Sequence, residues 1–470
     1  MVGITSFGFY VPAYRLKRDE ISRAWKMKSL GGERAVAGHD EDSLTMAVNA
    51  TLDYMKVSQK QVRGLFFAST TPPYKEKQSA AMIAAAADLP EDTRTADFMD
   101  SLRSGTIALN SAIDAVKSGS SESVMVVASD SRMGAGKSQF EQLFGDGAVA
   151  LVIGNSEVIA TIEGNYSIYS EFHDTWRLDG NQFVQSWEER FILTEGYVNS
   201  MEKVISGILK KHKLTTKVFA KVILYGPDVR SQANLARRLG FDLQTQVEDL
   251  PFQSIGHAGT AALPIMIVSA LCTAREGDKI LVANYGDGGD ALILQVTQNV
   301  EKLQGKERIK ERLARKIYID YERYLNWRDL VPLEEARRPE FRPPSITCLW
   351  RERKSILGLY GNKCNQCGTV QYPPQRICAK CRGKDDFEDY KLSNKEGKIF
   401  TYAIDSLTSS RDVPAIFGVI DFEGGGRVMC EVTECEPSQI KIGMPVEMCF
   451  RKVSRKGAIP NYFWKAKPRS

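Results

Sequence analysis

The sequence has no cysteine before Cys272, although the chain is 470 residues long and contains nine cysteines in all. A thiolate is the side-chain nucleophile that acyl-transferring enzymes most often use to form a covalent thioester. The part of the chain that precedes Cys272 therefore contains no thiol that can act in this way. Histidine is also scarce, with four residues in the whole chain.

Long apolar runs are missing as well. No run reaches the length of about 18 residues that a transmembrane helix requires. The opening stretch MVGITSFGFYVPAYRL has neither a positively charged start nor a small-residue cleavage site. We therefore expect a cytoplasmic protein without a membrane span. The net charge of +5 is small for this length and does not indicate nucleic-acid binding, although a mildly basic groove would suit a phosphorylated ligand.

Four of the cysteines form two close pairs with the spacing C-x2-C-x10-C-x2-C, namely Cys364, Cys367, Cys378 and Cys381. Each pair can bind one side of a tetrahedral ion from a tight turn, and thiolates suit zinc. Four thiolates close the coordination shell, so we predict a structural rather than a catalytic zinc. The alternative is a ribbon that has lost its metal and is held by apolar packing.

An internal repeat organises residues 1–298. SGTIAL (104–109), a helix and VMVVAS (124–129) recur as AGTAAL (258–263), a helix and ILVANY (280–285). The offset is nearly constant, which predicts two related α/β halves, about 1–160 and 161–298. Alternating strands and helices favour a largely parallel sheet.

Two short patterns refine this prediction. Asp42 or Ser43 is expected to cap a helix that begins near residue 44. A Gly-Asp-Gly turn follows a strand in each half, within FGDGAVALVIG and YGDGGDALILQV. Such a turn lets backbone approach a ligand closely, but a plain hairpin turn is the simpler interpretation.

The composition changes after residue 298. Residues 299–354 are predicted to form a charged helix followed by the Pro- and Arg-rich linker EEARRPEFRPPS. A solvated helix face explains the Lys and Arg residues of this segment better than a basic binding patch does. The zinc ribbon then spans 355–390. Short strands separated by Gly, Pro and Ser turns predict a small all-β OB barrel over 391–470. Because the barrel lacks a basic and aromatic stripe, we do not predict that it binds nucleic acid.

Residues 1–298 resemble the thiolase superfamily, and most closely its hydroxymethylglutaryl-CoA synthase and ketoacyl synthase III branch. The matching stretches are GERAVAGHDEDSLTMAV, RSGTIAL, ASDSRMGAG, FGDGAVALVIG and GDKILVANYGDGGDA. CNQC, YPPQRICAKC and the strands after them resemble zinc-ribbon/OB-fold proteins that accompany thiolases. The resemblance implies a duplicated five-layer α/β fold, an acyl-CoA substrate, a homodimer and, in addition, the possibility of another thiolase-pathway subunit.

The family's reactive residues are replaced at each matched position. The cysteine nucleophile falls at Leu102, the general-base glutamate at Thr70, the histidine at Tyr225 and the asparagine at His257. The resemblance therefore does not imply an acyl-cysteine mechanism here.

Cleavage of a β-hydroxyacyl-CoA by retro-aldol chemistry needs a base and enolate-stabilising donors but no thiolate. For this reaction we predict three catalytic residues, Tyr225, His257 and Asp100, the last of which has helix capping as an equally good interpretation. Ser101 is a weaker candidate for a replacement nucleophile. For substrate binding we predict Arg103, Trp176, Arg177, Thr70 and Leu102. For the arginines and Trp176, surface packing or a structural ion pair explains the sequence equally well.

Two other functions stay open. One is Claisen condensation or acyl transfer of the synthase type with an unusual acyl acceptor. The other is a non-catalytic acyl-CoA-binding subunit of a thiolase complex. The sequence does not identify the acyl chain or the direction of the reaction.

Overall fold

A computed structural model describes residues 1–58, 60–303, 306–332, 334, 345–408, 410–453 and 459–469. The chain forms two compact units. Unit 1 consists of Met1–Ala37, Asp42–Ala84 and Leu89–Tyr321, and unit 2 of Gly38–Glu41, Ala85–Asp88 and Glu322–Ser470. Most of the predicted Pro- and Arg-rich stretch, residues 335–344, lies outside the described residues.

Unit 1 is built on one nine-stranded sheet in the order β11-β12-β13-β8-β1-β7-β6-β4-β5. The strands are β1 (Gly3–Tyr10), β4 (Gly64–Ala68), β5 (Arg94–Phe98), β6 (Ser123–Asp130), β7 (Gly147–Gly154), β8 (Ala160–Tyr169), β11 (Lys221–Leu224), β12 (Lys279–Tyr285) and β13 (Gly288–Val296). β1 and β8 start the two halves and pair with each other, so β1 is an inner strand with β7 on its other side.

The sequence repeat corresponds to a repeated topology. In the first half β1 is followed outward by β7, β6 and β4, and in the second half β8 is followed by β13, β12 and β11. The prediction of a largely parallel sheet is wrong, because β1–β7, β6–β7, β8–β13, β12–β13 and β1–β8 are antiparallel. The second Gly-Asp-Gly turn reverses the chain directly from β12 into β13, whereas the first follows α5 (Gln139–Leu143) and leads into β7. The alternation of elements alone did not reveal these reversals.

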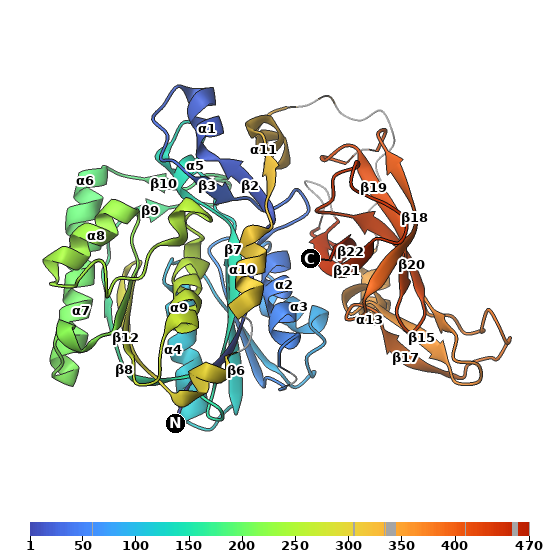
Figure 1. Cartoon of the computed structure of the whole chain (residues 1–470), viewed down its shortest axis with the longest axis horizontal. Helices are drawn as coiled ribbons and strands as arrows, with labels where there is room; N and C mark the ends of the chain where they lie inside the picture. The colour runs from blue at the N-terminus through green and yellow to red at the C-terminus, as the bar shows by residue number, and fades with distance from the viewer. Residues whose placement is uncertain are drawn as a thin grey trace. The chain divides into compact units, whose positions relative to one another are not determined.

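Helices make three layers around the two halves of the sheet, as Figure 1 shows. α4 (Ser104–Lys117) and α9 (Ala262–Thr273) lie in the middle, and α9 contacts both β7 of the first half and β11 of the second. α2 (Ser43–Met55) covers the outer face of the first half, and α7 (Asn199–His212) that of the second. This arrangement is the predicted five-layer α/β fold. α9 is enclosed along most of its length and is accordingly apolar on most of its surface, with Ser269 exposed.

Local sequence signals explain where these helices begin. Asp42 caps α2 as predicted, because its side chain accepts from the backbone N–H of Thr45 at 2.9 Å while the Thr45 hydroxyl accepts from the Asp42 N–H. The remaining elements of this part of the chain are β2 (Tyr14–Lys17), α1 (Arg18–Trp25), β3 (Glu33–Ala35), α3 (Ser79–Ala86), α5 (Gln139–Leu143), β9 (Thr175–Trp176), β10 (Gln185–Ser186), α6 (Glu189–Phe191) and α8 (Val229–Arg238).

The first part of the predicted 299–354 linker packs onto unit 1. α10 (Lys306–Ala314) places Arg308 and Arg312 3.4 and 3.1 Å from the carboxylate of Asp53 in α2, and β14 (Ile317–Ile319) pairs in parallel with β2. The later helices are α11 (Tyr321–Trp327), α12 (Ile346–Arg351) and α13 (Arg353–Leu357). The two arginines in this charged segment therefore serve a structural ion-pair network.

Unit 2 contains the zinc ribbon and the barrel. The ribbon strands are β15 (Tyr360–Cys364), β16 (Val370–Gln371) and β17 (Phe387–Lys391). A closed five-stranded barrel follows in the order β18-β19-β20-β22-β21, as predicted for an OB fold. Its strands are β18 (Gly397–Asp405), β19 (Ala415–Phe422), β20 (Arg427–Val432), β21 (Pro445–Lys452) and β22 (Tyr462–Pro468). The sequence patterns identified the first four strands and missed β22.

Candidate active site

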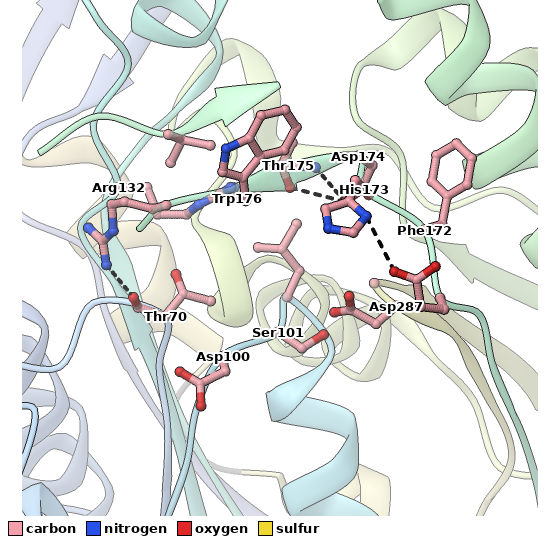
Figure 2. Close-up of a pocket in the computed structure, with 15 residues that line it drawn as sticks. Thr70, Asp100, Ser101, Arg132, Phe172, His173, Asp174, Thr175, Trp176 and Asp287 are labelled. Carbon is pink, nitrogen blue, oxygen red and sulfur yellow. Dashed lines mark hydrogen bonds and ion pairs between the residues drawn. The ribbon is translucent and has the colours of Figure 1, made fainter. Parts of the chain in front are cut away.

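A pocket of about 410 Å³ opens in unit 1 beside the turn that holds Leu102. Its volume lies in the range of small-molecule sites. Six residues predicted from the sequence line it, namely Thr70, Asp100, Ser101, Leu102, Trp176 and Arg177. Figure 2 shows side chains of this set converging with those of Arg132, His173, Asp174 and Asp287. The structure thus brings together segments that lie far apart in the sequence.

The turn between β5 and α4 brings Leu102 to the pocket. Asp100 takes a left-handed conformation (φ 73°), and the Ser104 N–H donates to the Ser101 carbonyl at 3.0 Å. Leu102 is 9% exposed, so its apolar side chain occupies a nearly closed position. α4 has no side-chain cap, so Asp100 does not cap it. The Ser101 hydroxyl accepts one weak hydrogen bond, from the Arg103 N–H at 3.4 Å, and is hydrogen-bonded to no base among the described residues.

The second Gly-Asp-Gly turn packs directly against this first turn. Gly286 has φ 152°, and a Cβ added to it would lie 3.1 Å from both the Ser101 Oγ and the Arg103 backbone nitrogen. The turn is a hairpin between β12 and β13, but it also carries Gly286 and Asp287 into the pocket lining. Only glycine permits this close approach.

Asp130, at the end of β6, joins the pocket segment at Thr70 in the first half to the start of α9 in the second half. One carboxylate oxygen accepts from the Ser69 hydroxyl at 3.0 Å, the Thr70 N–H at 2.7 Å and the Thr71 hydroxyl at 2.9 Å. The other accepts from the Thr260 N–H at 2.8 Å, just before α9. Asp130 is fully buried. The Thr70 hydroxyl oxygen is also buried and has no hydrogen-bond partner among the described residues.

His257 lies next to this junction, between the end of β11 and the start of α9. Burial, together with the nearby Arg132 charge, lowers the pKa of His257 to about 3. The ring is therefore neutral at physiological pH. The Gly259 N–H donates to its Nδ1 at 3.3 Å. Because Nδ1 is the acceptor, the ring proton belongs on Nε2. Nε2 is buried and has no partner within the described part of the chain, so the ring presents an unused N–H donor.

A cluster of three tyrosines contacts His257 through Tyr225. The Tyr225 ring stands edge-on to the imidazole with centroids 5.0 Å apart, and Tyr285 and Tyr197 lie 6.0 and 6.2 Å from Tyr225. Burial raises the pKa of Tyr225 and of Tyr285 above the ordinary value, so both phenols keep their protons. Tyr225 and His257 do not themselves line the pocket described above; they flank Arg132, which does.

Asp174 is the carboxylate with a raised pKa in the pocket lining. Burial raises the pKa of Asp174, while hydrogen bonds from the Thr175 N–H and the Tyr285 hydroxyl lower it by less. A carboxylate whose proton affinity is increased in a cleft is a candidate general base. Asp100, predicted for this role, also lines the pocket but is exposed.

The predicted substrate-binding arginines have different surroundings. Arg103 turns to structural partners, because its Nη1 lies 3.3 Å from the Asp290 carboxylate and 3.0 Å from the Ile168 carbonyl, and Arg103 does not line the pocket. Arg177 lines the pocket and donates to the Thr70 carbonyl at 2.6 Å. Trp176 lies on β9 and donates from Nε1 to Gln185 at 2.8 Å. The substrate-binding roles of all three stay predictions.

Sequence reasoning missed Asp130, Arg132 and Asp174. The first two belong to ASDSRMGAG, a stretch that carried the family resemblance, and they lie at or just after the carboxyl end of β6. Polar residues at the end of a strand in an α/β sheet are a usable signal for a site. Nothing in the sequence around Arg132 distinguishes a buried arginine from a surface one.

The four ribbon cysteines form a site that fits zinc. Their Sγ atoms all lie within 4.8 Å of one another, and the Cys364–Cys381 and Cys367–Cys378 pairs are 3.6 and 3.5 Å apart. A tetrahedral zinc–thiolate site with bonds of about 2.3 Å places its sulfurs about 3.8 Å apart. The donor set closes the coordination shell, so the metal would hold the knuckle turns together and supply no open position for catalysis.

Substitution of Cys378 by serine should remove the zinc and unfold the ribbon. We expect one zinc per wild-type chain and less than a tenth of that in the variant, because structural zinc supplies about 10–16 kcal/mol of binding free energy that folding of such a domain uses. Elemental analysis and thermal denaturation measure both effects. Cys348→Ser, outside the four-cysteine set, is the control and should keep full zinc content. Equal zinc in the Cys378 variant and the wild type would contradict this assignment.

The described residues contain no helix with both the length and the apolarity that a membrane span demands. Three family models match the chain. Residues 96–168 match 3-oxoacyl-[acyl-carrier-protein] synthase III, residues 354–388 the rubredoxin-like zinc ribbon domain of ChsH2, and residues 390–451 the C-terminal OB-fold domain of ChsH2. Together with the repeated five-layer fold and the pocket in unit 1, these matches define a thiolase-superfamily protein with a C-terminal zinc ribbon and OB barrel.

Curated relatives narrow this class. The chain is 31% identical over 332 residues to the hydroxymethylglutaryl-CoA synthase of Thermococcus gammatolerans, covering 69% of this chain and 95% of the relative. It is 29% identical over 346 residues to that of Methanocaldococcus jannaschii, covering 71% of this chain and all of the relative. The chain belongs to the hydroxymethylglutaryl-CoA synthase family.

Solved structures agree on the fold. An HMG-CoA synthase complexed with CoA matches with a TM-score of 0.64 at 18% identity, covering 73% of this chain and 95% of that one. The 3-oxoacyl-[acyl-carrier-protein] synthase III from Aquifex aeolicus matches with a TM-score of 0.55 at 21% identity, covering 63% of this chain and all of that one.

Proposed function

We propose that this chain is an acyl-CoA carbon–carbon lyase that cleaves β-hydroxyacyl-CoA by retro-aldol chemistry, or forms it in the reverse direction. The observation that carries the proposal is Leu102, an apolar side chain where the family resemblance puts the nucleophile, with no cysteine among the described residues that line the pocket. Claisen condensation through an acyl-enzyme requires a nucleophile, whereas an aldol cleavage does not. Membership of the family together with the apolar residue at position 102 therefore supports carbon–carbon bond chemistry without a covalent acyl-enzyme.

The proposed reaction shifts electrons from the β-hydroxyl oxygen toward the thioester as the carbon–carbon bond breaks. A base removes the hydroxyl proton, the oxygen becomes a carbonyl, and the bond between the α and β carbons breaks. The electrons of that bond pass to the thioester as an enolate, which takes a proton at the α carbon. The products are a ketone or aldehyde and a shortened acyl-CoA, so atoms and charges balance without an oxidant.

The residues around the pocket supply each role in this scheme. Neutral His257 lies next to Arg132 and not in the pocket lining, and we assign its Nε2–H to the oxygen of a thioester that reaches past Arg132, where it would act as an oxyanion-hole donor. The protonated phenol of Tyr225 is a second donor or the acid for the α carbon. Asp174 serves as the base, since burial has raised its pKa, and Asp100 is the alternative base. Thr70 offers a further unused hydroxyl.

The substrate is a coenzyme A thioester, in keeping with family membership and with the CoA that a matching synthase structure carries. Trp176 and Arg177 are proposed to contact it at the pocket. A structural zinc in the ribbon is the one metal in the proposal. A homodimer, an additional thiolase-pathway subunit and a cytoplasmic location are also part of the proposal; the family resemblance supports the first two, and the sequence supports the third.

Incubation of the purified full chain with a panel of β-hydroxyacyl-CoA esters tests the proposal. We expect a shortened CoA ester and an equimolar ketone or aldehyde by mass spectrometry, with one deuterium at the α carbon when the reaction is run in D₂O. The matched acyl-CoA without the β-hydroxyl should not be cleaved. Bound but uncleaved esters across the whole panel would contradict the lyase and would favour a non-catalytic acyl-CoA-binding subunit.

Condensation or acyl transfer of the synthase type is the second candidate, and family membership is the observation that favours it. It requires a new acyl acceptor. Ser101 is the candidate, because it lines the pocket and precedes Leu102, the position where the family resemblance puts the cysteine. Intact-protein mass spectrometry after exposure to acyl-CoA distinguishes the two. An acyl adduct on Ser101 would support transfer, whereas unmodified protein that turns over β-hydroxyacyl-CoA supports the lyase.

A further inference from the structure

Arg103 lies behind the place where two turns of the pocket lining meet, although it does not line the pocket itself. One turn carries Ser101 and Leu102, and the other carries Gly286 and Asp287. Figure 2 draws a side chain from each turn, Ser101 and Asp287, in the pocket. A Cβ added to Gly286 would lie 3.1 Å from the Arg103 backbone nitrogen and 3.3 Å from the Leu102 Cβ. Because the two turns are in contact, a change in their separation changes the shape of the pocket.

The Arg103 side chain joins the first turn to the second half of unit 1. Its Nη1 donates to the Ile168 carbonyl at 3.0 Å and more weakly to the Gly289 carbonyl at 3.4 Å. These two residues face each other across the β8–β13 pair. The same nitrogen lies 3.3 Å from the Asp290 carboxylate. The guanidinium therefore reaches the strand that leads out of the second turn, and the neighbour of that strand.

Asp290 ties the start of α4 to this bridge at a second point. Its other carboxylate oxygen accepts from the Thr106 hydroxyl at 2.7 Å, about one helical turn after Arg103. Asn284, near the end of β12, donates to the Thr106 hydroxyl oxygen at 3.3 Å. Asp290, Thr106 and Asn284 are each no more than 2% exposed, and the Arg103 side chain is 14% exposed. A buried network from both strands of the second turn thus holds the helix start, and with it Leu102.

The internal repeat contains a counterpart of this network. Thr106 and Thr260 occupy matching positions, and the Thr260 N–H donates to the buried carboxylate of Asp130 at 2.8 Å. Each middle helix therefore has, at or just before its start, a threonine that a buried aspartate of the opposite half holds in place. Arg103 matches His257 in this repeat, so a charged side chain stands in the first half where the second half has the proposed donor.

A buried ion pair adds little to the stability of a fold, because the cost of removing two charges from water offsets their attraction. An apolar pair of similar volume often stabilises a protein as well or better. Hydrogen-bonded charges do, however, restrict distance and direction more than apolar contacts do. The contribution of the Arg103–Asp290 pair is therefore the geometry that it imposes on the two turns.

We propose that Arg103 and Asp290 are positioning residues that hold the two turns of the pocket lining at the separation that a bound thioester requires. This inference rests on the proposed function in one respect, namely that the pocket holds a thioester of coenzyme A, and it does not depend on the reaction. Arg103 acts through the turns at Leu102 and Gly286 and touches no part of the ligand. A direct contact of Arg103 with the phosphates of coenzyme A is the alternative that the test separates.

Two thioesters of different length distinguish positioning from phosphate contact. Titration calorimetry on the full-length protein compares butyryl-CoA with butyryl-pantetheine, which has the same acyl group and thioester arm but no phosphates. Arg103→Met should weaken the binding of both thioesters by the same factor, about tenfold, because the pocket itself has changed shape. A loss for butyryl-CoA alone would overturn the proposal and would assign Arg103 to the phosphates.

Variants of both partners test the pair itself. The hydrogen bonds of Arg103 all use Nη1, so Arg103→Lys, with one charged donor, should restore affinity to within about threefold of wild type. Asp290→Asn leaves the arginine in place and should still lose about tenfold for both thioesters. The double variant Arg103→Met/Asp290→Asn should lose no more than the weaker single variant, because both changes break one interaction. Independent, multiplying losses would overturn the proposal.

Amide hydrogen exchange tests the positions of the turns without any ligand. In Arg103→Met, exchange at residues 101–103 and 286–289 should accelerate at least about tenfold, whereas exchange in β6 should not change. Arg230→Met removes an exposed arginine on α8 and should behave as wild type in every measurement. A lower melting temperature in Arg103→Met with wild-type affinities and wild-type exchange at the two turns would overturn the proposal and leave a purely structural pair.

The outcomes for the two proposals are independent. Thioester binding that depends on Arg103 and Asp290, without cleavage of any hydroxylated ester, would leave this inference intact and contradict the lyase. Cleavage by an Arg103→Met variant with wild-type affinities and wild-type exchange would do the reverse.

Discussion

Replacement of His257 by phenylalanine should lower kcat for cleavage of a β-hydroxyacyl-CoA by about 10²–10³-fold, which is the usual effect of removing one oxyanion donor. An aromatic ring remains to make the edge-on contact with Tyr225, so the protein should remain folded. The loss concentrates in kcat because the Nε2–H bond strengthens only as charge develops on the thioester oxygen. Steady-state kinetics with the best ester from the panel measure it.

An asparagine at the same position is the matched variant. It restores a neutral N–H donor, and it is the residue that the family resemblance puts there, so His257→Asn should recover part of the lost kcat. Unchanged kcat in His257→Phe would mean that the imidazole is only a packing element. A loss in both variants with an altered melting temperature would indicate a structural role.

The pH profile gives a second readout of the same group. Because burial holds the pKa of His257 at about 3, the ring stays neutral and able to donate as the pH falls from 8 to 5. An acid limb in kcat within that range belongs to a carboxylate such as Asp174, whose pKa is raised by burial. Asp174→Asn should remove that limb together with most of the activity, whereas His257→Asn should leave the position of the limb unchanged.

Replacement of Asp130 by alanine should destabilise unit 1 by about 4 kcal/mol. The change leaves four donors without their acceptor, namely the buried Ser69 hydroxyl and Thr260 N–H and the part-buried Thr70 N–H and Thr71 hydroxyl. A buried donor that loses its acceptor costs about 1–3 kcal/mol, and partial relaxation keeps the sum below the additive limit. A large decrease in the urea midpoint of the unit 1 transition, with faster amide exchange at Thr70 and Thr260, is the expected measurement.

The Asp130→Asn variant tests the contribution of the carboxylate charge, because asparagine has nearly the same shape as aspartate. Its carbonyl oxygen can serve the three donors of the Ser69–Thr71 turn, but its amide N–H₂ then faces the Thr260 N–H, so Asp130→Asn should be intermediate between wild type and alanine. Asp92→Ala, at an exposed aspartate, should change the free energy of unfolding by no more than about 0.5 kcal/mol. A normal midpoint for Asp130→Ala would show that the turn and the start of α9 are held by other contacts.

Much of the fold could be predicted because its signals are local or repeated. The 104–109 and 258–263 helix starts, the cap at Asp42 and the four metal-binding cysteines each depend on residues close together in the sequence. The direction of the strands could not be predicted in the same way, because alternation of helices and strands does not distinguish a parallel crossover from a return connection. β6 pairs antiparallel with β7 across the connection 131–146, and β12 pairs antiparallel with β13 through a tight hairpin.

The strand that the sequence did not reveal has a physical explanation. β22 contains Lys465 and Lys467, which read as surface residues, yet both side chains are buried and paired with carboxylates, Lys465 with Asp40 at 2.9 Å and Lys467 with Glu447 at 3.4 Å. In the candidate site, too, the burial of charged residues could not be predicted from the local sequence. Thr70, Leu102, Tyr225 and His257 were identified by family resemblance, whereas Arg132 and Asp174 depend on burial, which the sequence around them does not indicate.

The inner position of β1 has a consequence for synthesis of the chain. Its partners in β7 and β8 lie far downstream, as the pairs Tyr10–Ala148 and Gly3–Thr161 show. At about 5–20 residues per second, β1 leaves the ribosome with both edges unpaired for roughly 7–30 s before either neighbour exists. Its apolar segment GITSFGFY, with both edges unpaired, is thus a site where a chaperone would protect the nascent protein.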